Sequence, residues 1–195
     1  MLPEYFALVS TAIVSLGALQ YLYLTVKGKV QPNRVTFLFW GLFPLIAFFA
    51  QYAEEVSSVI WITLSTALLP LAVVAVSYLN PAAYWKLKAR DYYLGGLAVF
   101  TILLWYLTND AVLAIVLALT ADFLAGIPTL IKSYTHPFSE DWQPYALNAI
   151  GFTLGIFAIQ EWVVAEAAYL VYLAIITSVF TVLIFVRQRM SAKIG

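Results

Sequence analysis

Residues 28–34 read Gly28-Lys29-Val30-Gln31-Pro32-Asn33-Arg34 and lead into an apolar segment that ends at Gln51. A second Gln-Pro pair, at residues 143–144, leads into an apolar segment that ends at Gln160. Each pair follows an apolar segment and a lysine-bearing loop, and each apolar segment is followed by a short acidic turn and another apolar segment. This pattern predicts two similar three-helix halves joined by one linker helix.

The composition indicates that lipid is the solvent. The 195 residues are 64% hydrophobic and 10% charged, and the mean hydropathy is +0.91. Soluble domains have about 45–50% apolar and about 25% charged residues. Because lipid cannot satisfy backbone polar groups and the apolar runs lack strand alternation, we expect an all-α membrane protein.

Seven apolar segments are long enough to be transmembrane helices, which need about 17–25 residues. They are residues 4–26, 35–52, 57–79, 92–107, 111–131, 144–159 and 163–186. We expect a 3+1+3 parallel repeat in which residues 1–80 form the first triple-helix bundle, 81–110 the linker helix and 111–195 the second bundle. One span between the triplets gives both triplets the same orientation.

The basic residues predict the orientation. All ten Lys and Arg residues fall in the loops after the first, third and fifth segments or in the C-terminal tail. The positive-inside rule therefore places the N-terminus outside and the C-terminus in the cytoplasm, which requires an odd number of spans. The opening Met-Leu-Pro-Glu carries no basic residue, so we expect the first segment to be retained rather than cleaved as a signal peptide.

Several classes of function are disfavoured. The chain has no cysteine and a single histidine, His136, so we expect no metal site and no cofactor. A net charge of zero gives no reason to expect nucleic acid as a partner. No nucleophile-elbow or zinc-protease motif occurs, so we expect that the protein is not an enzyme and has no catalytic residues.

Asp122 is the one acid that we place within the hydrocarbon, away from the ends of an apolar segment. An ionised Asp at mid-bilayer costs about 2.5–3.5 kcal/mol on insertion scales, so such residues face a cavity, a partner or a proton path. We therefore treat Asp122 as a proton-coupling candidate. The alternative is a structural hydrogen bond to a neighbouring helix.

Four polar or aromatic residues in the spans are candidates for binding a solute: Trp40, Asn148, Gln20 and Gln51. The Trp40 ring could stack on a ring-containing solute. The amide side chains could instead form ordinary hydrogen bonds between helices.

Two intrahelical prolines, Pro44 and Pro128, are candidate hinges because proline removes a backbone hydrogen bond. Gly126 lies two residues before Pro128 and is included in that hinge. Asn33 and Arg34 begin the second helix and could form a cytoplasmic gate. Alternatively, the prolines could produce only a static bend in their helices. The loop residues could serve only to provide the positive charge that orients the chain across the membrane.

The 3+1+3 layout resembles the PQ-loop superfamily, which includes the SWEET sugar transporters, the PnuC vitamin transporters, cystinosin-type exporters and the KDEL-receptor fold. Residues 28–40 resemble the Gly-x-x-x-Pro-Asn-x-x-Thr-Trp-x-x-Trp pattern of prokaryotic members, with Phe37 at the first Trp position. The superfamily signature is Pro-Gln, whereas both copies here read Gln-Pro. The Asp122-Phe123 pair is similar to the acid that begins the fifth helix of cystinosin-type proteins, which implies a link to protons.

The resemblance implies a small-solute transporter in a prokaryotic cytoplasmic (inner) membrane, with a mid-membrane site between the two bundles. Its partners would be membrane lipids and a small-molecule solute, with self-association into a homo-oligomer left open. The alternative is a non-transporting receptor or scaffold of the KDEL-receptor type, which would recognise its partner through residues 132–142.

Overall fold

The computed structural model describes residues 5–53, 60–108, 111–159 and 164–193. Within these residues it is entirely helical and has no strand. The elements are α1 (Tyr5–Val26), α2 (Arg34–Ala53), α3 (Ile60–Leu79), η1 (Pro81–Ala83), α4 (Ala89–Leu107), α5 (Ala111–Thr135), η2 (Pro137–Ser139), α6 (Trp142–Ala158) and α7 (Val164–Ser191).

The expectation of an all-α membrane protein is confirmed. Among the described residues, three helical segments are long and apolar enough to cross a membrane: Phe6–Val26, Ile115–Thr135 and Ala167–Ser191. Large apolar side chains also cover the outside of the other helices; Leu79, for example, is 82% exposed and Tyr106 is 79% exposed. Such an outer surface is stable when lipid, rather than water, surrounds it.

Several helices are longer than the hydropathy of the sequence predicts. The helix α4 begins at Ala89 rather than at residue 92, α5 continues to Thr135 rather than 131, and α7 continues to Ser191 rather than 186. The added turns carry Arg90, Lys132 and Arg187. Hydropathy marks only the part of a helix that fits the hydrocarbon, whereas the helix itself continues into the polar region.

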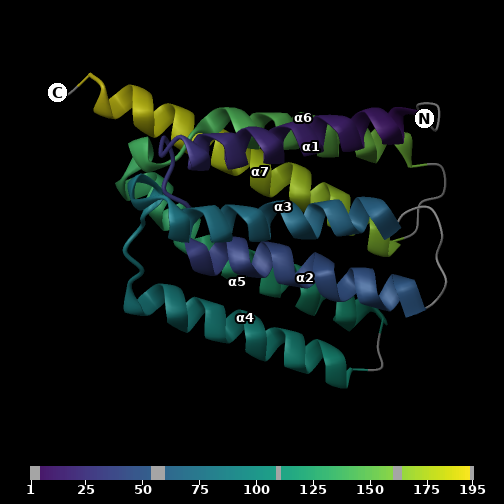
Figure 1. Ribbon diagram of the computed structural model, residues 1–195. Helices are drawn as coiled ribbons and strands as arrows, with labels where there is room; N and C mark the ends of the chain where they lie inside the picture. The colour runs from purple at the N-terminus through teal and green to yellow at the C-terminus, as the bar shows by residue number, and fades with distance from the viewer. Residues whose placement is uncertain (1–4, 54–59, 109–110, 160–163, 194–195) are drawn as a thin grey trace.

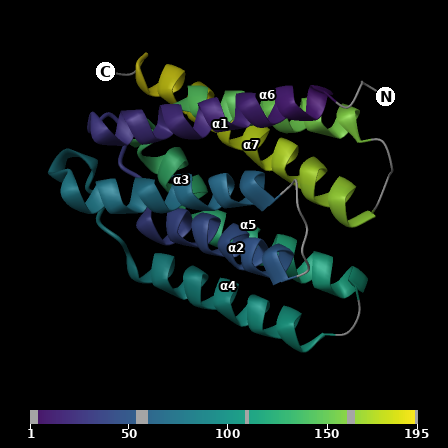
Figure 2. The same ribbon diagram turned by 45° about the vertical axis from the view of Figure 1, so that its right-hand side comes forward.

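The helices pack in a similar order in the two parts of the chain (Figures 1 and 2). The helix α3 contacts both α1 and α2, and α7 contacts both α5 and α6. We call α1–α3 the first half and α5–α7 the second half. The halves meet where α1 packs along α6 and α2 packs on α5, while α4 lies mainly against α5.

Small residues bring α1 and α6 close together. A Cβ atom on Gly17 would lie 2.8 Å from the Pro144 carbonyl oxygen, and one on Gly151 would lie 3.1 Å from the Ser10 carbonyl oxygen. The Ser10 hydroxyl donates to the Gly151 carbonyl at 2.8 Å. Glycine at both positions therefore sets the distance between the halves, as is common at close helix crossings in membranes.

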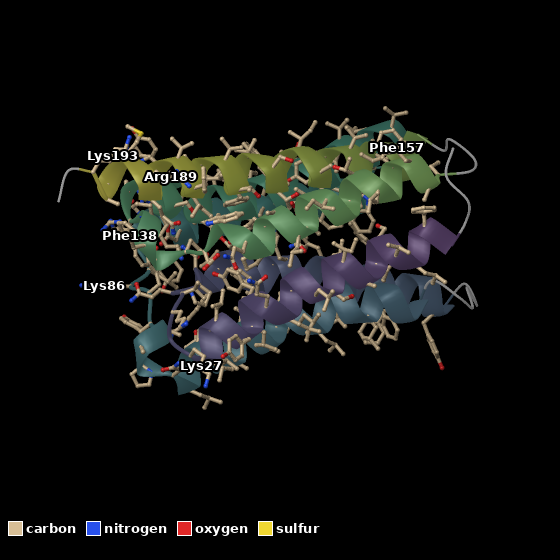
Figure 3. All side chains as sticks on the ribbon, turned by 90° about the horizontal axis from the view of Figure 1, so that it is seen from above. Lys27, Lys86, Phe138, Phe157, Arg189 and Lys193 are labelled. Atoms are coloured by element: carbon tan, nitrogen blue, oxygen red, sulfur yellow. The ribbon has the colours of Figure 1, made fainter. Side chains whose placement is uncertain are left out.

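One end of the bundle collects the basic residues. Figure 3 shows Lys27, Lys86, Arg189 and Lys193 at this end and Phe157 at the opposite end. The same end contains the connections after α1, α3 and α5 and the end of α7 (Figure 1). We call it the basic end.

Replacing Gly17 with Ala should destabilise the protein, because the new methyl group would overlap a backbone oxygen of α6 and force the helices apart. We expect a loss of about 1–3 kcal/mol, as in other overpacked interiors. The matched control is Gly96→Ala on α4, where a Cβ would meet nothing within 4 Å. This control should be neutral or gain up to about 1 kcal/mol from helix propensity. Thermal unfolding of both variants in the same detergent would measure the difference; equal melting temperatures would contradict this interpretation.

Candidate functional site

A buried ion pair lies at the basic end. Lys132 is in the last turn of α5, and Glu140 follows η2, just before α6. The Lys132 Nζ lies 2.5 Å from Glu140 Oε1, and neither side chain is exposed. Dehydrating two charges costs several kcal/mol per ion unless further polar groups surround them.

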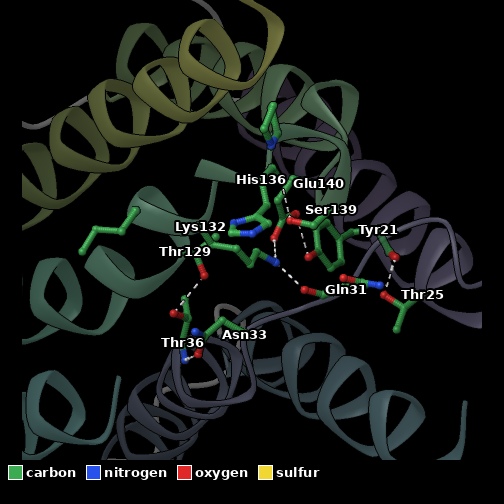
Figure 4. Close-up of polar contacts among 12 residues, drawn as sticks. Tyr21, Thr25, Gln31, Asn33, Thr36, Thr129, Lys132, His136, Ser139 and Glu140 are labelled. Carbon is green, nitrogen blue, oxygen red and sulfur yellow. Dashed lines mark hydrogen bonds and ion pairs between the residues drawn. The ribbon is translucent and has the colours of Figure 1, made fainter. Parts of the chain in front are cut away.

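Polar groups from both halves surround this pair (Figure 4). The Tyr21 hydroxyl on α1 donates to Glu140 Oε2 at 2.8 Å, and the Tyr145 hydroxyl on α6 lies 3.3 Å from the same oxygen. The Lys132 ammonium also donates to the Gln31 carbonyl, in the loop after α1. We call these five residues the Lys132–Glu140 network.

Further hydrogen bonds beside the network join the same loops and helices. The Gln31 N–H donates to the Ser139 carbonyl at 2.9 Å. The Thr129 hydroxyl on α5 donates to the Thr36 hydroxyl on α2 at 2.9 Å, and Thr36 donates in turn to the Ala125 carbonyl at 2.7 Å. The halves are thus bonded to one another across the basic end.

An aromatic layer follows the network toward the middle of the bundle. The rings of Tyr21 and Phe37 stack at 4.6 Å between centroids, and those of Tyr145 and Phe180 stack at 4.8 Å. The indole of Trp40 packs edge-on against both phenylalanines, at 5.4 Å from Phe37 and 5.8 Å from Phe180. Offset and edge-on contacts of this kind are the favoured arrangements of aromatic rings. The layer therefore joins α1, α2, α6 and α7 in one packed unit.

A small cavity adjoins the aromatic layer between the halves. Its volume is about 80 Å³, room for a few water molecules at roughly 30 Å³ each. The residues lining this central cavity are Ala18, Tyr21, Phe37, Trp40, Leu69, Pro70, Val73, Pro144, Tyr145 and Asn148. They come from α1, α2, α3 and α6. The sequence candidates Trp40, on α2, and Asn148, on α6, thus both line this cavity.

Both of these candidates carry a buried polar atom that lacks a partner. The Trp40 Nε1 and the Asn148 Oδ1 are inaccessible to solvent and have no hydrogen-bond partner among the described residues. A buried donor or acceptor left unpaired costs about 1–3 kcal/mol. Because neither atom has accessible area, both point into packed protein rather than into the cavity, and the Asn148 oxygen packs against Gly17 of α1.

Asp122 lies away from the central cavity. Its Oδ2 accepts a hydrogen bond from the Tyr172 hydroxyl on α7 at 2.6 Å, and the residue is not part of the cavity lining. The contact links α5 to α7 within the second half. This geometry fits the structural alternative for Asp122, and a role in proton transfer remains a proposal.

The remaining polar candidates occupy other positions. The Gln20 amide donates to Gln143 Oε1 at 2.9 Å at an exposed site outside the cavity lining, and the side chain of Gln51 lies outside the described part of the structure. Asn33 is fully buried, and its Oδ1 caps α2 by accepting from the N–H groups of residues 35 and 36. Arg34 donates to the Ser77 hydroxyl at 3.0 Å and carbonyl at 2.5 Å. Both gate candidates thus hold helices in place at the basic end.

The hinge candidates lie inside continuous helices. Pro44 is within α2 and Pro128 within α5, while Gly126 is buried with a Trp40 ring carbon 3.5 Å from where its Cβ would be. A third intrahelical proline, Pro70 in α3, lines the central cavity. Pro70 is not among the hinge candidates, although it lies inside an apolar run as Pro44 does.

The Lys132–Glu140 pair is also absent from the sequence candidates. A signal for it exists, because Glu140 is one of the few acids on the side that carries all the basic residues. Of the acidic residues in the sequence, only Asp91, Glu140 and Asp141 lie on the same side as the basic residues, and the first two are buried. An acidic residue among so many basic ones is a candidate for an ion pair.

Comparison of the chain with models of known protein families, with curated proteins and with solved structures gives no match. The site is therefore interpreted from its own geometry.

Removing one member of the ion pair should destabilise the protein more than removing both. Lys132→Met leaves the Glu140 carboxylate buried without its cation, which typically costs about 3–5 kcal/mol. The double variant Lys132→Met/Glu140→Gln keeps an acceptor for the tyrosine hydroxyls and should recover most of that loss. Thermal unfolding in detergent would compare the two; a double variant less stable than Lys132→Met would show that the charges do not compensate one another.

Proposed function

We propose that the protein is a small-solute transporter of the PQ-loop/SWEET-like type, with its solute site in the central cavity between the halves. The observation that carries this proposal is the central cavity itself, which lies between the halves and is lined by Trp40 and Asn148 together with the rings of Tyr21 and Tyr145. Small-molecule sites are typically concave spaces with mostly apolar and aromatic walls and a few polar side chains.

The packing of the helices supports a 3+1+3 parallel repeat of seven transmembrane helices. The third helix of each half contacts the other two, and α4, which connects the halves in the sequence, packs mainly against α5 (Figure 1). Two like bundles that meet at a shared site can rock against one another, which is the usual basis of alternating access. The gathering of basic residues at one end supports an outside N-terminus and a cytoplasmic C-terminus. The proposed location, a prokaryotic cytoplasmic membrane, rests on the resemblance to prokaryotic members of the superfamily.

In this proposal the structure represents the state closed at the basic end. The Lys132–Glu140 network and the Thr36–Thr129 bond tie the halves together there. Opening that end would require these contacts to separate while the halves pivot. Pro44, Pro128 and Gly126 are the positions where α2 and α5 could bend.

Locking the basic end should stop transport reversibly. The hydroxyls of Thr36 and Thr129 are 2.9 Å apart, so cysteines at both positions would place their sulfur atoms beside one another, as a disulfide needs. The natural chain has no cysteine, so the engineered pair is unambiguous. We expect oxidation of Thr36→Cys/Thr129→Cys to abolish uptake into proteoliposomes and a reductant to restore it. The control Thr36→Ser/Thr129→Ser keeps the hydroxyls and cannot form a disulfide. Full activity of the oxidised protein would contradict opening at this end.

The same variant provides the test of transport itself. Proteoliposomes would be incubated with a defined mixture of small neutral, anionic and cationic solutes, and their contents measured by mass spectrometry. We expect at least one solute to enter with the reduced variant and to be excluded with the oxidised one. Entry of every solute at the rate of protein-free liposomes, with folded protein in the membrane, would contradict the transporter proposal.

Proton coupling through Asp122 is a separate part of the proposal. Asp122→Asn removes the titrating group but keeps an oxygen that can accept from Tyr172, so the protein should fold. If Asp122 carries the proton, uptake driven by a pH gradient should fall to the rate seen without a gradient. Tyr172→Phe is the control, because it removes only the hydrogen bond and should keep part of the pH response. Unchanged pH dependence in Asp122→Asn would exclude the residue as the proton carrier.

A receptor or scaffold of the KDEL-receptor type is the second candidate. A pocket of about 510 Å³ at the basic end supports it, with a lining that includes Lys29, Trp85, His136, Phe138 and Ser139. Its size falls in the range of small-molecule sites, and much of its wall is the loop after α5. A receptor would retain its partner with the basic end locked by the disulfide, whereas a transporter would lose its activity.

A further inference from the structure

The pocket at the basic end is separate from the central cavity. Its volume is about 510 Å³, and the linings of the two spaces have no residue in common. Its wall comes from the loops after α1, α3 and α5, the last residue of α5 and the last turn of α7. We call it the basic-end pocket. Because segments of both halves form it, it exists only in the folded bundle.

Hydrogen bonds fix the segments that form this wall. Gly28 has a left-handed conformation, with φ +65°, that ends α1. The N–H groups of residues 28 and 29 then donate to carbonyls of the last turn of α1, at 3.0 and 2.9 Å. The Gln31 N–H donates to the Ser139 carbonyl at 2.9 Å, and the Gln188 amide on α7 donates to the Pro137 carbonyl at 3.0 Å. A ligand would therefore not have to order these loops, which lowers the cost of binding.

The charges around the basic-end pocket favour an anion. Its lining includes Lys29 and His136 and no acidic residue. Lys29 forms no ion pair with a described residue. Each acid at this end already has another partner: Asp91 accepts from the Lys88 N–H, Glu140 pairs with Lys132, and Asp141 accepts from the Gln143 N–H. The positive charge beside the pocket is thus not neutralised by the protein.

Several hydrogen-bond donors in the wall are available to such an anion. The side chains of Lys29, Gln31 and Ser191 are at least partly exposed and form no hydrogen bond with a described residue. The hydroxyls of Thr135 and Ser139, in contrast, already donate to backbone carbonyls. The available donors belong to different segments, so they can approach an anion from several sides. A phosphate monoester suits them because it has three strong acceptor oxygens.

Two aromatic side chains give the same pocket an apolar part. Trp85 is partly buried and packs edge-on against the His136 ring, with 5.2 Å between centroids. Phe138 is 63% exposed, and Figure 3 shows it among the basic residues of this end. A phosphate ion alone would fill only a small part of the pocket. The remaining space can hold a ring or a chain attached to the phosphate, against these aromatic surfaces.

We infer that the basic-end pocket binds an organic phosphate, with the phosphate beside Lys29 and an apolar group beside Trp85 and Phe138. The phosphate could belong to a soluble phosphomonoester or to the headgroup of an anionic lipid, which basic clusters at a membrane surface attract. The inference does not rest on the transporter proposal, because the pocket and the central cavity are distinct. For the receptor candidate, it names the class of ligand.

The probe that tests the inference is phenyl phosphate, titrated calorimetrically into the purified protein in phosphatidylcholine nanodiscs. Phenol lacks the phosphate and inorganic phosphate lacks the ring, and protein-free nanodiscs provide the blank. We expect phenyl phosphate to bind at least roughly tenfold more tightly than either comparison compound. Binding of phenol or inorganic phosphate as tight as that of phenyl phosphate, or no binding of phenyl phosphate to the folded protein, would overturn the inference.

Two lysines of the same turn provide matched variants. Lys29→Gln removes the charge that lines the pocket, whereas Lys27→Gln removes an exposed charge that is outside the lining. We expect Lys29→Gln to weaken phenyl phosphate binding roughly three- to tenfold, as for the loss of one charge-assisted hydrogen bond. Lys27→Gln should change it by less than about twofold, because water and salt screen an exposed charge. Equal weakening in both variants would show that only the general charge of this end attracts the probe, and would overturn the site.

A second titration distinguishes a lipid headgroup from a soluble phosphate. Phosphatidic acid in the nanodisc supplies a phosphate monoester, whereas oleate at matched surface charge supplies negative charge without phosphate. If a lipid headgroup occupies the pocket, phosphatidic acid should weaken phenyl phosphate binding more than oleate does, and this difference should disappear in Lys29→Gln. Equal effects of the two lipids would support the inference with a soluble phosphate as the ligand.

The outcomes also separate this inference from the transporter proposal. Uptake of a solute through the reduced Thr36→Cys/Thr129→Cys protein, without binding of phenyl phosphate, would retain transport and reject the phosphate site. Binding of phenyl phosphate with no uptake of any solute would retain the phosphate site and favour the receptor candidate.

Discussion

The buried charge pair of Lys132 and Glu140 is the constraint on which the basic end depends. Neither side chain has any exposed area, so each charge must be compensated by protein atoms alone. The compensation comes from the Gln31 carbonyl and from the hydroxyls of Tyr21 and Tyr145. Because these groups belong to different halves, the pair can be fully compensated only while the halves are together.

The central cavity shares two residues with that network. Tyr21 and Tyr145 contribute their rings to the cavity wall and their hydroxyls to Glu140. A solute that moved either ring would also move a hydrogen bond of the buried carboxylate. The central cavity and the Lys132–Glu140 network are thus physically connected through two side chains, and no long pathway through the bundle is needed to relate them.

The helices and the basic end could be predicted from the sequence because each apolar segment responds to lipid independently of the others. An apolar run must be helical wherever its neighbours lie. The pairing of Glu140 with Lys132, and of Asp122 with Tyr172 fifty residues away, depends instead on how distant helices meet. Trp40 and Asn148 could be named from the sequence as candidate solute contacts, but the cavity that both residues line could not be predicted. The repeat and the direction of the chain across the membrane remain predictions.

The location of the charges also determines what an opening at the basic end would involve. Separation of the halves would remove the Tyr21 hydroxyl and the Gln31 carbonyl from the ion pair. Buried charges that lose such partners without gaining water are strongly destabilising. Water must therefore replace those groups as they leave. The aromatic layer of Phe37, Trp40 and Phe180 lies behind the network and has no such requirement, since its contacts are apolar. In the proposed opening, hydration of the ion pair must therefore accompany the separation of the halves, whereas separation of the aromatic layer leaves no charge to be compensated.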